Sequence, residues 1–134
     1  MMTLDDIDRK ILKILQENAR TSLKTIAEKT FLSSPAVSAR IEKMEKDGII
    51  SGYHALIDPI RLGYHILAFI NLNVDPDDKP KFYGEYSMLL KVAFQSTMEL
   101  DLFIGQLQKF GKTSTQIVFS THVGPRGVSV ETIG

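Results

Sequence analysis

The sequence predicts an α+β protein: an N-terminal three-helix helix-turn-helix domain joined to a C-terminal α/β sandwich, ferredoxin-like, with an antiparallel sheet. Apolar residues recur at helical spacing up to Gly48 and alternate after it, and the 134 residues suffice for two small domains. We expect residues 1–50 to form the helical domain and 51–63 a linker strand and turn. Residues 64–123 would form the second domain, and 124–134 a tail that extends into solvent or toward a partner.

The composition excludes several classes of protein. With no cysteine the chain has no disulfide, zinc–thiolate site or thiol nucleophile, and no apolar run is long enough to span a bilayer. The start of the chain is acidic, unlike a secretory signal, so a cytoplasmic protein with no membrane partner is expected. Sixteen basic residues balance sixteen acidic ones, which argues against a nonspecific nucleic-acid coat. Any DNA-binding charge must therefore be concentrated on one face.

Two helices are expected before the third, more informative one. The first would be capped by Thr3, with Asp6 at the capping-box position. The second would be capped by Thr21 or Ser22 and would end at residues 31–33. The apolar stripe of the first helix comprises Leu4, Ile7, Ile11, Ile14 and Leu15. This stripe predicts that the first helix braces the other two.

The third helix separates its residues into distinct faces. Ser34 would cap it, Pro35 would occupy its first position, and Gly48 would follow its end. At about 100° per residue, the buried face holds Val37, Ile41 and Met44. A neighbouring face holds Ala36, Ala39, Arg40, Lys43 and Lys46, while Glu42 and Glu45 point away. The positive charge is therefore concentrated after all.

Two functions fit this cationic face. Small residues between cations let a helix lie deep in a DNA groove, where Ser, Arg and Lys reach base edges and phosphates. The same residues also suit a solvated helix face, stabilised by Glu42 and Lys46 at i,i+4 spacing. A bracing helix, a short second helix and a tight turn before a Ser-Pro start describe a helix-turn-helix unit. That context favours DNA binding.

The second half of the chain predicts strands and one helix. Strands are expected over residues 49–57, 64–74, 87–94 and 113–123, with a helix capped by Ser96 and Glu99 and ended by Gly111. In the strand over 64–74, one face carries Ile66, Ala68, Ile70, Leu72 and Val74, and the other His65, Leu67, Phe69, Asn71 and Asn73. The three histidines, His54, His65 and His122, are isolated and lack metal-ligand spacing. No cofactor, metal site or catalytic residue is expected.

The order of short motifs along the chain is specific. They are residues 4–12, 18–20, 26–27, 32–33, 37, 40–41, 44–45, 47–50, 52–53, 58–59, 62–64, 84–87 and 89–92. In this order they resemble the Lrp/AsnC family of prokaryotic transcription regulators over nearly the whole chain. Phe31 departs from the family pattern, in which a small residue, often glycine, is usual in that turn.

The resemblance implies functional residues and partners. Its DNA-reading surface falls on Ser33, Ser34, Pro35, Ala36, Ser38, Ala39, Arg40 and Lys43. Arg40 would read a base edge or a phosphate, and Lys43 would bind phosphate. The partners implied are double-stranded DNA, a small effector such as an amino acid, and further copies of the chain, as a dimer and higher oligomer. An effector loop would comprise Gly84, Glu85, Tyr86 and Ser87, although an ordinary turn explains these residues equally well.

One stretch is too short for the family pattern. Only residues 75–83 separate the strand ending at Val74 from Gly84, where the family's domain places a helix and the start of a strand. A crossover with its helix needs at least about ten to twelve residues. The domain could therefore lack one helix and part of a strand. We expect missing residues with a break between Tyr83 and Gly84, and normal peptide bonds throughout residues 79–87 would refute this.

Two alternatives remain. Siroheme decarboxylases resemble the same family in both halves, but their substrate bears many carboxylates. After Gly52 this chain offers only Arg61 and Arg126 as arginines to bind them. A nonspecific DNA-architectural protein would differ from a regulator only in its ratio of specific to nonspecific binding.

Overall fold

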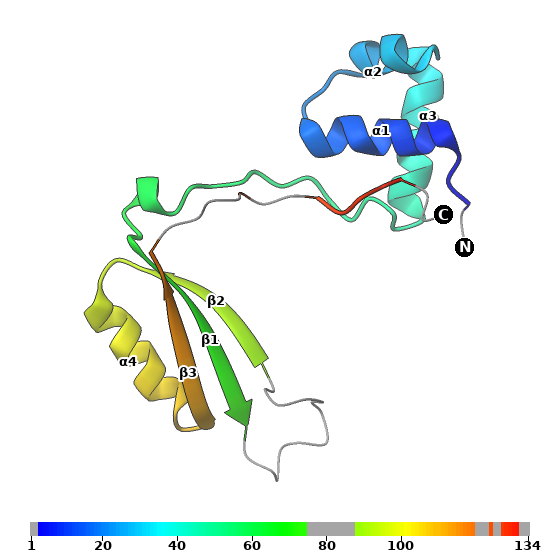
Figure 1. Ribbon diagram of the computed structural model, residues 1–134. Helices are drawn as coiled ribbons and strands as arrows, with labels where there is room; N and C mark the ends of the chain where they lie inside the picture. Colours follow the sequence, from blue (N-terminus) through cyan, green and yellow to red (C-terminus); the bar gives the residue numbers. More distant parts are fainter. Residues whose placement is uncertain (1–2, 75–87, 120–123, 125–126, 132–134) are drawn as a thin grey trace. The chain divides into compact units, whose positions relative to one another are not determined.

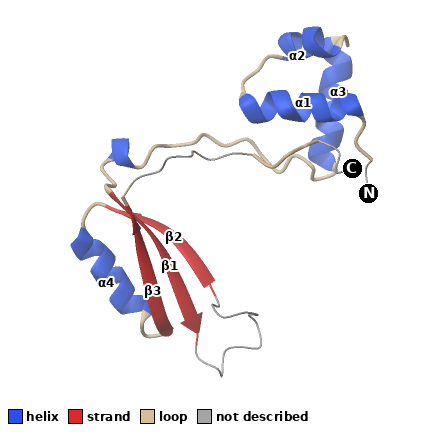
Figure 2. Ribbon diagram, viewed as in Figure 1, coloured by secondary structure: helices blue, strands red, loops and turns tan. Residues whose placement is uncertain are grey.

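A computed structural model describes most of the chain as two compact units. The described residues are 3–74, 88–119, 124 and 127–131. One unit comprises Met1–Ala55 with Pro125–Gly134, and the other Leu56–Gly124. Figure 1 follows the chain through both. Figure 2 shows helices as the only regular elements described in the first unit, and a sheet with an α-helix and a short 3-10 turn in the second. Among the described helices, none combines the length and apolar character needed to cross a membrane.

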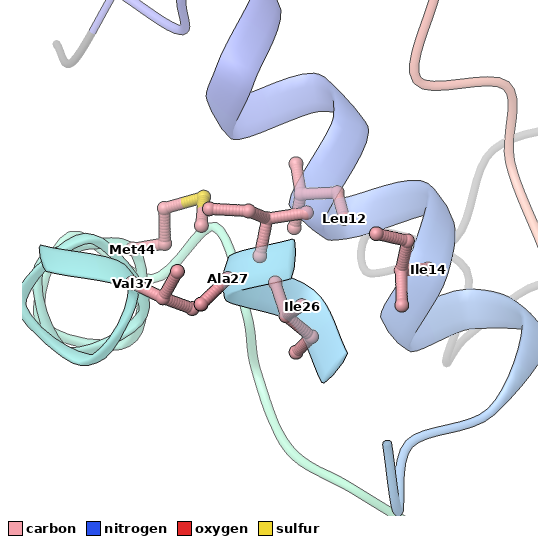
Figure 3. Close-up of a cluster of buried hydrophobic side chains, with 7 residues drawn as sticks. Leu12, Ile14, Ile26, Ala27, Val37 and Met44 are labelled. Atoms are coloured by element: carbon pink, nitrogen blue, oxygen red, sulfur yellow. The ribbon is translucent and has the colours of Figure 1, made fainter. Parts of the chain in front are cut away.

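The helical unit contains the three predicted helices, α1 (Asp6–Glu17), α2 (Leu23–Thr30) and α3 (Ser34–Lys46). Their buried core consists of Ile11, Leu12, Ile14, Ile26, Ala27, Val37 and Met44. The labelled side chains of this core converge between the three helices in Figure 3. Four of them, Ile11, Ile26, Val37 and Met44, are fully excluded from solvent. Each helix buries one face, and the helical spacing of apolar residues in the sequence marks that face. The spacing therefore predicts the core.

Two helix starts differ from the sequence expectation. Asp5, not Thr3, caps α1: its carboxylate accepts a hydrogen bond from the Asp8 N–H at 2.8 Å, and the Asp8 carboxylate accepts one from the Asp5 N–H. This pair forms a reciprocal capping box. Ser33, not Ser34, caps α3, because Ser33 is extended and its hydroxyl accepts from the Ala36 N–H. Ser22 caps α2 as one of the two expected residues.

The chain end packs on α1, contrary to the expected free tail. The Arg9 guanidinium donates to the Val130 carbonyl at 2.7 Å, and the Gln16 amide donates to the Val128 carbonyl at 3.0 Å. The Val130 side chain packs against the helical core. Small residues and glycine predict an unstructured tail only where no surface nearby offers donors and an apolar contact. Here α1 offers both.

The second unit is a three-stranded antiparallel sheet covered on one face by a helix. Its elements are β1 (Ile66–Val74), β2 (Met88–Phe94), α4 (Thr97–Leu107) and β3 (Gly111–Val118), with strand order β2-β1-β3. Ala68, Ile70 and Leu72 of β1 are buried, as the alternation predicts, and Ala68 and Ile70 share a core with Leu100 of α4. Ser96 caps α4, with the Glu99 N–H donating to its hydroxyl.

The opposite face of the sheet is open within the described residues. The register aligns Leu67 with Ala93 and Val118, and Phe69 with Lys91 and Gln116. These residues are partly or fully exposed, because α4 packs on the other side. The sheet therefore presents a mixed apolar and polar surface with no covering element in the described chain.

The expected strand over residues 49–57 is wrong for the chain taken alone. Residues 51–58 form no strand, and Leu56 and Ile57 are 81% and 63% exposed. A strand requires a hydrogen-bonded neighbour, and alternation in sequence does not reveal whether one exists. A 3-10 turn (Ile60–Leu62), closed by Gly63 at φ 91°, follows this segment where the sequence predicts a turn.

Two expectations fall outside the described residues. The proposed break between Tyr83 and Gly84, with the missing helix and part of a strand, lies within residues 75–87. The expected effector residues, Gly84, Glu85, Tyr86 and Ser87, lie there as well. Both remain predictions from the sequence.

Candidate nucleic-acid interface

A tight turn connects α2 to α3. Phe31 ends α2 in the left-handed conformation, and the N–H of Leu32 donates to the Ala27 carbonyl at 3.1 Å. Leu32 then packs against the helical core. Ser33 caps the next helix, so only two residues lie between the end of α2 and the cap of α3. The turn therefore fixes the start of α3 relative to α2.

The exposed face of α3 presents small and cationic side chains. Ala39, Lys43 and Lys46 are exposed, and Ala36 is half-buried near the start of the helix. The hydroxyl of Ser38 donates to the Glu42 carboxylate at 3.1 Å. Small side chains at the front of an exposed helix allow its backbone to approach another surface closely, and the lysines can pair with anions there.

Arg40 differs from the free cation that the helical wheel predicts. Its guanidinium lies 2.7 Å from the Asp5 carboxylate and 2.9 Å from the Asp8 carboxylate, with 31% of the side chain exposed. Hydrogen bonds to these carboxylates raise the pKa of Arg40. In turn, Arg40 and the Asp8 backbone N–H lower the pKa of the Asp5 carboxyl below its usual range. Arg40 therefore ties α3 to the first turn of α1.

The predicted DNA-reading residues lie together on one segment. All eight belong to α3 or its cap: Ser33, Ser34, Pro35, Ala36, Ser38, Ala39, Arg40 and Lys43. Within this set Ser33 is committed to the helix cap, Ser38 to Glu42 and Arg40 to α1. Ala39 and Lys43 are exposed without such a commitment among the described contacts.

Two features of this region were missed by reasoning from the sequence. The Asp5–Asp8–Arg40 cluster joins residues more than thirty positions apart, and the acidic start of α1 was its only sequence signal. The second is the contact between Lys10 of α1 and Phe31, whose ring centroid lies 5.8 Å from the lysine Nζ. The sequence shows that Phe31 is unusual for this turn, but it does not indicate that Lys10 lies beside it.

Comparisons with known proteins agree with this arrangement. The family described as winged helix-turn-helix DNA-binding matches residues 4–51. The HTH-type transcriptional regulator FL11 of Pyrococcus horikoshii is 35% identical, over 89% of this chain and 91% of its own length. Among solved structures, E. coli AsnC aligns with a TM-score of 0.81 and 27% identity, over 96% of this chain and 99% of that one. The leucine response regulatory protein LrpA of Mycobacterium tuberculosis aligns with a TM-score of 0.79 and 26% identity, over 94% and 99%.

These relatives confirm the expected fold class and the expectation of a regulator. FL11 is a transcriptional regulator, so the alternative of a siroheme decarboxylase is not supported. The α1–α3 unit coincides with the matched DNA-binding region, and the sheet unit completes the two-part fold of the solved relatives. The chain is a helix-turn-helix transcription regulator that belongs to the Lrp/AsnC family.

Proposed function

We propose that the exposed face of α3 reads a specific duplex DNA sequence from the major groove. The observation that carries this proposal is the exposure of Ala39 and Lys43 on one face of the helix that follows the helix-turn-helix turn. In such units the second helix enters the major groove, and its N-terminal residues approach base edges. Ala36 and Ala39 leave room for the groove walls, and Lys43 pairs with a phosphate.

Arg40 acts in this proposal as a positioning residue. Its contacts with Asp5 and Asp8 hold α3 against α1, so the exposed face keeps one orientation. The sequence predicts a different role, direct contact with a base or phosphate. For that contact the guanidinium would have to break its hydrogen bonds to two carboxylates. Both roles predict weaker DNA binding when Arg40 is replaced. Only the positioning role predicts a less stable helical unit.

Replacing Lys43 with glutamine tests the phosphate contact. The expected result is a uniform loss of affinity across duplex sequences and a decrease of about one in the slope of log K against log salt concentration. Fluorescence anisotropy at several salt concentrations measures both, with a duplex selected by the chain from a randomised library. Lys109→Gln removes the same charge from an exposed site in the sheet unit and serves as the matched control. An unchanged slope for Lys43→Gln would refute the assignment.

The same titrations distinguish a regulator from an architectural protein. A sequence-specific regulator binds the selected duplex at least about a thousandfold more tightly than a scrambled one at equal salt. Equal affinities would favour DNA packaging instead. Because the chain carries no net charge, we expect modest affinity for each helical unit and tight binding through several units on one duplex. Such a protein acts where chromosomal DNA lies, which in prokaryotes is the cytoplasm.

We further propose that the sheet unit mediates self-association and effector sensing. The open sheet face around Leu67 and Phe69 supports association, because covering a partly apolar surface removes apolar area from water, which is favourable. The name of the Mycobacterium tuberculosis relative, a leucine response regulatory protein, supports an amino acid as effector. Effector binding would shift the assembly or the placement of the DNA-binding units.

Light scattering of the chain with and without each amino acid tests both parts. We expect a mass of at least twice 15.0 kDa, and a change in mass or in DNA affinity with one amino acid. Replacing Phe69 with lysine would place a charge at the centre of the open face and should shift the mass toward the monomer. A monomeric wild-type chain would contradict the assembly proposal, and indifference to every amino acid would contradict the effector proposal.

A further inference from the structure

Phe31 combines two unfavourable features in the turn before α3. Its backbone lies at φ 58° and ψ 34°, and it is the one non-glycine residue with positive φ among the described residues. The left-handed region disfavours residues with a bulky side chain and suits glycine or asparagine. The residue is also 92% exposed. Neither the backbone conformation nor packing of the ring in the core therefore explains why phenylalanine occupies this position.

The turn itself does not use the ring. Its closing hydrogen bonds run from the N–H groups of Phe31 and Leu32 to the Ala27 carbonyl, and the side chain that packs into the core is Leu32. Glycine at position 31 would keep these hydrogen bonds and remove the backbone strain. A strained, exposed residue that its own turn does not require indicates a functional contact.

A lysine from another helix accompanies the ring. The Nζ of Lys10, on α1, lies 5.8 Å from the centroid of Phe31, within the range of a cation–π contact. Lys10 is exposed as well. The two side chains together present an apolar ring and a cation beside the start of α3. This pair suits a surface that carries apolar groups next to negative charge.

We propose that Phe31 and Lys10 form a second contact with duplex DNA at the rim of the major groove. The inference rests on the proposed function. In a helix-turn-helix unit the first helix crosses the DNA backbone and the start of the second reaches base edges, so the turn between them would lie near the edge of the groove. The Phe31 ring would pack on apolar C–H groups of the duplex, those of a deoxyribose or a thymine methyl. Lys10 would pair with the neighbouring phosphate.

Replacing Phe31 with glycine or asparagine separates DNA contact from stability. Both residues suit the left-handed backbone, so the thermal midpoint of unfolding should rise or stay the same. Affinity for the selected duplex should nevertheless fall about tenfold, because the variants lose the free energy that the wild type gains by burying part of the ring on binding. Phe31→Tyr retains the ring and should bind like the wild type. Wild-type affinity in both the glycine and asparagine variants, or an equal loss in the tyrosine variant, would overturn the proposal.

Two further measurements identify the contacted groups. Duplexes with uracil in place of thymine lack the methyl groups. If the wild type loses affinity for such a duplex and Phe31→Gly does not, the ring contacts a thymine methyl. If the wild type binds both duplexes equally, the ring contacts deoxyribose. Lys10→Gln should lower the salt slope by about one, and an unchanged slope would overturn its phosphate contact. If the wild-type chain binds no duplex, the proposed function itself fails; if it binds but the Phe31 variants match it, only this inference fails.

Discussion

Replacing Arg40 with methionine should destabilise the helical unit by about 2–3 kcal/mol, because it leaves a buried carboxylate without its cation. Asp8 is only 3% exposed, and the Arg40 guanidinium lies 2.9 Å from its carboxylate. Methionine retains much of the apolar part of the arginine side chain, so the loss of stability reflects mainly the lost ion pairs. The Asp5 N–H still donates to Asp8 after the change, which keeps the expected effect below that of a wholly unpaired buried charge.

Urea unfolding and hydrogen exchange of the α1 amides measure this effect. Lys43→Met removes a charge from the same helix at an exposed position and should leave the stability unchanged. Because the pKa of Asp5 is lowered below its ordinary value of 3.8, its share of the stability is present above that pH. It is lost as the pH falls through the folded value. The difference between wild type and Arg40→Met should therefore shrink in acid. Equal stability of the two proteins at neutral pH would contradict the positioning role of Arg40.

Replacing Ala39 with glutamate should weaken binding to the selected duplex roughly a hundredfold, about 3 kcal/mol. Ala39 is exposed near the middle of α3, on the face that we place in the groove. A carboxylate there meets the phosphates and the electronegative groove, and its longer side chain prevents close approach. Glutamate forms helices almost as readily as alanine, so the fold should be unaffected.

Anisotropy titrations at fixed salt check this result, with circular dichroism to verify the helices. Met98→Glu adds the same carboxylate to α4 at a residue that is 73% exposed, and it controls for the change in net charge. It should bind the duplex like the wild type. A variant with glutamate at position 39 that binds normally would place the DNA-contacting surface elsewhere.

Local patterns carried most of the prediction of the fold. The three N-terminal helices and their core followed from helical spacing, because Ile11, Ile26 and Val37 each lie on the single buried face of their helix. Local patterns locate helix starts less precisely, since neighbouring residues compete as caps: Ser33 rather than Ser34 adopts the extended backbone that a cap requires. Asp5 replaced Thr3 because it can exchange hydrogen bonds with Asp8.

Features set by tertiary contacts could not be predicted. A helical wheel places Arg40 on the outer face of α3, but its long side chain reaches the carboxylates of α1. The alternation in residues 49–57 predicts a strand, yet the described chain provides no neighbour for it. The hydrogen bond from Arg9 to Val130 joins residues 121 positions apart, beyond the range of any local pattern.

The most direct test of the DNA-binding face is the change in backbone amide NMR signals when the selected duplex is added to the 134-residue chain. We expect the largest changes in residues 31–43, a further change at Lys10, and little change in α4. Changes concentrated in α4 or the sheet, with α3 unaffected, would contradict the proposed DNA-binding face.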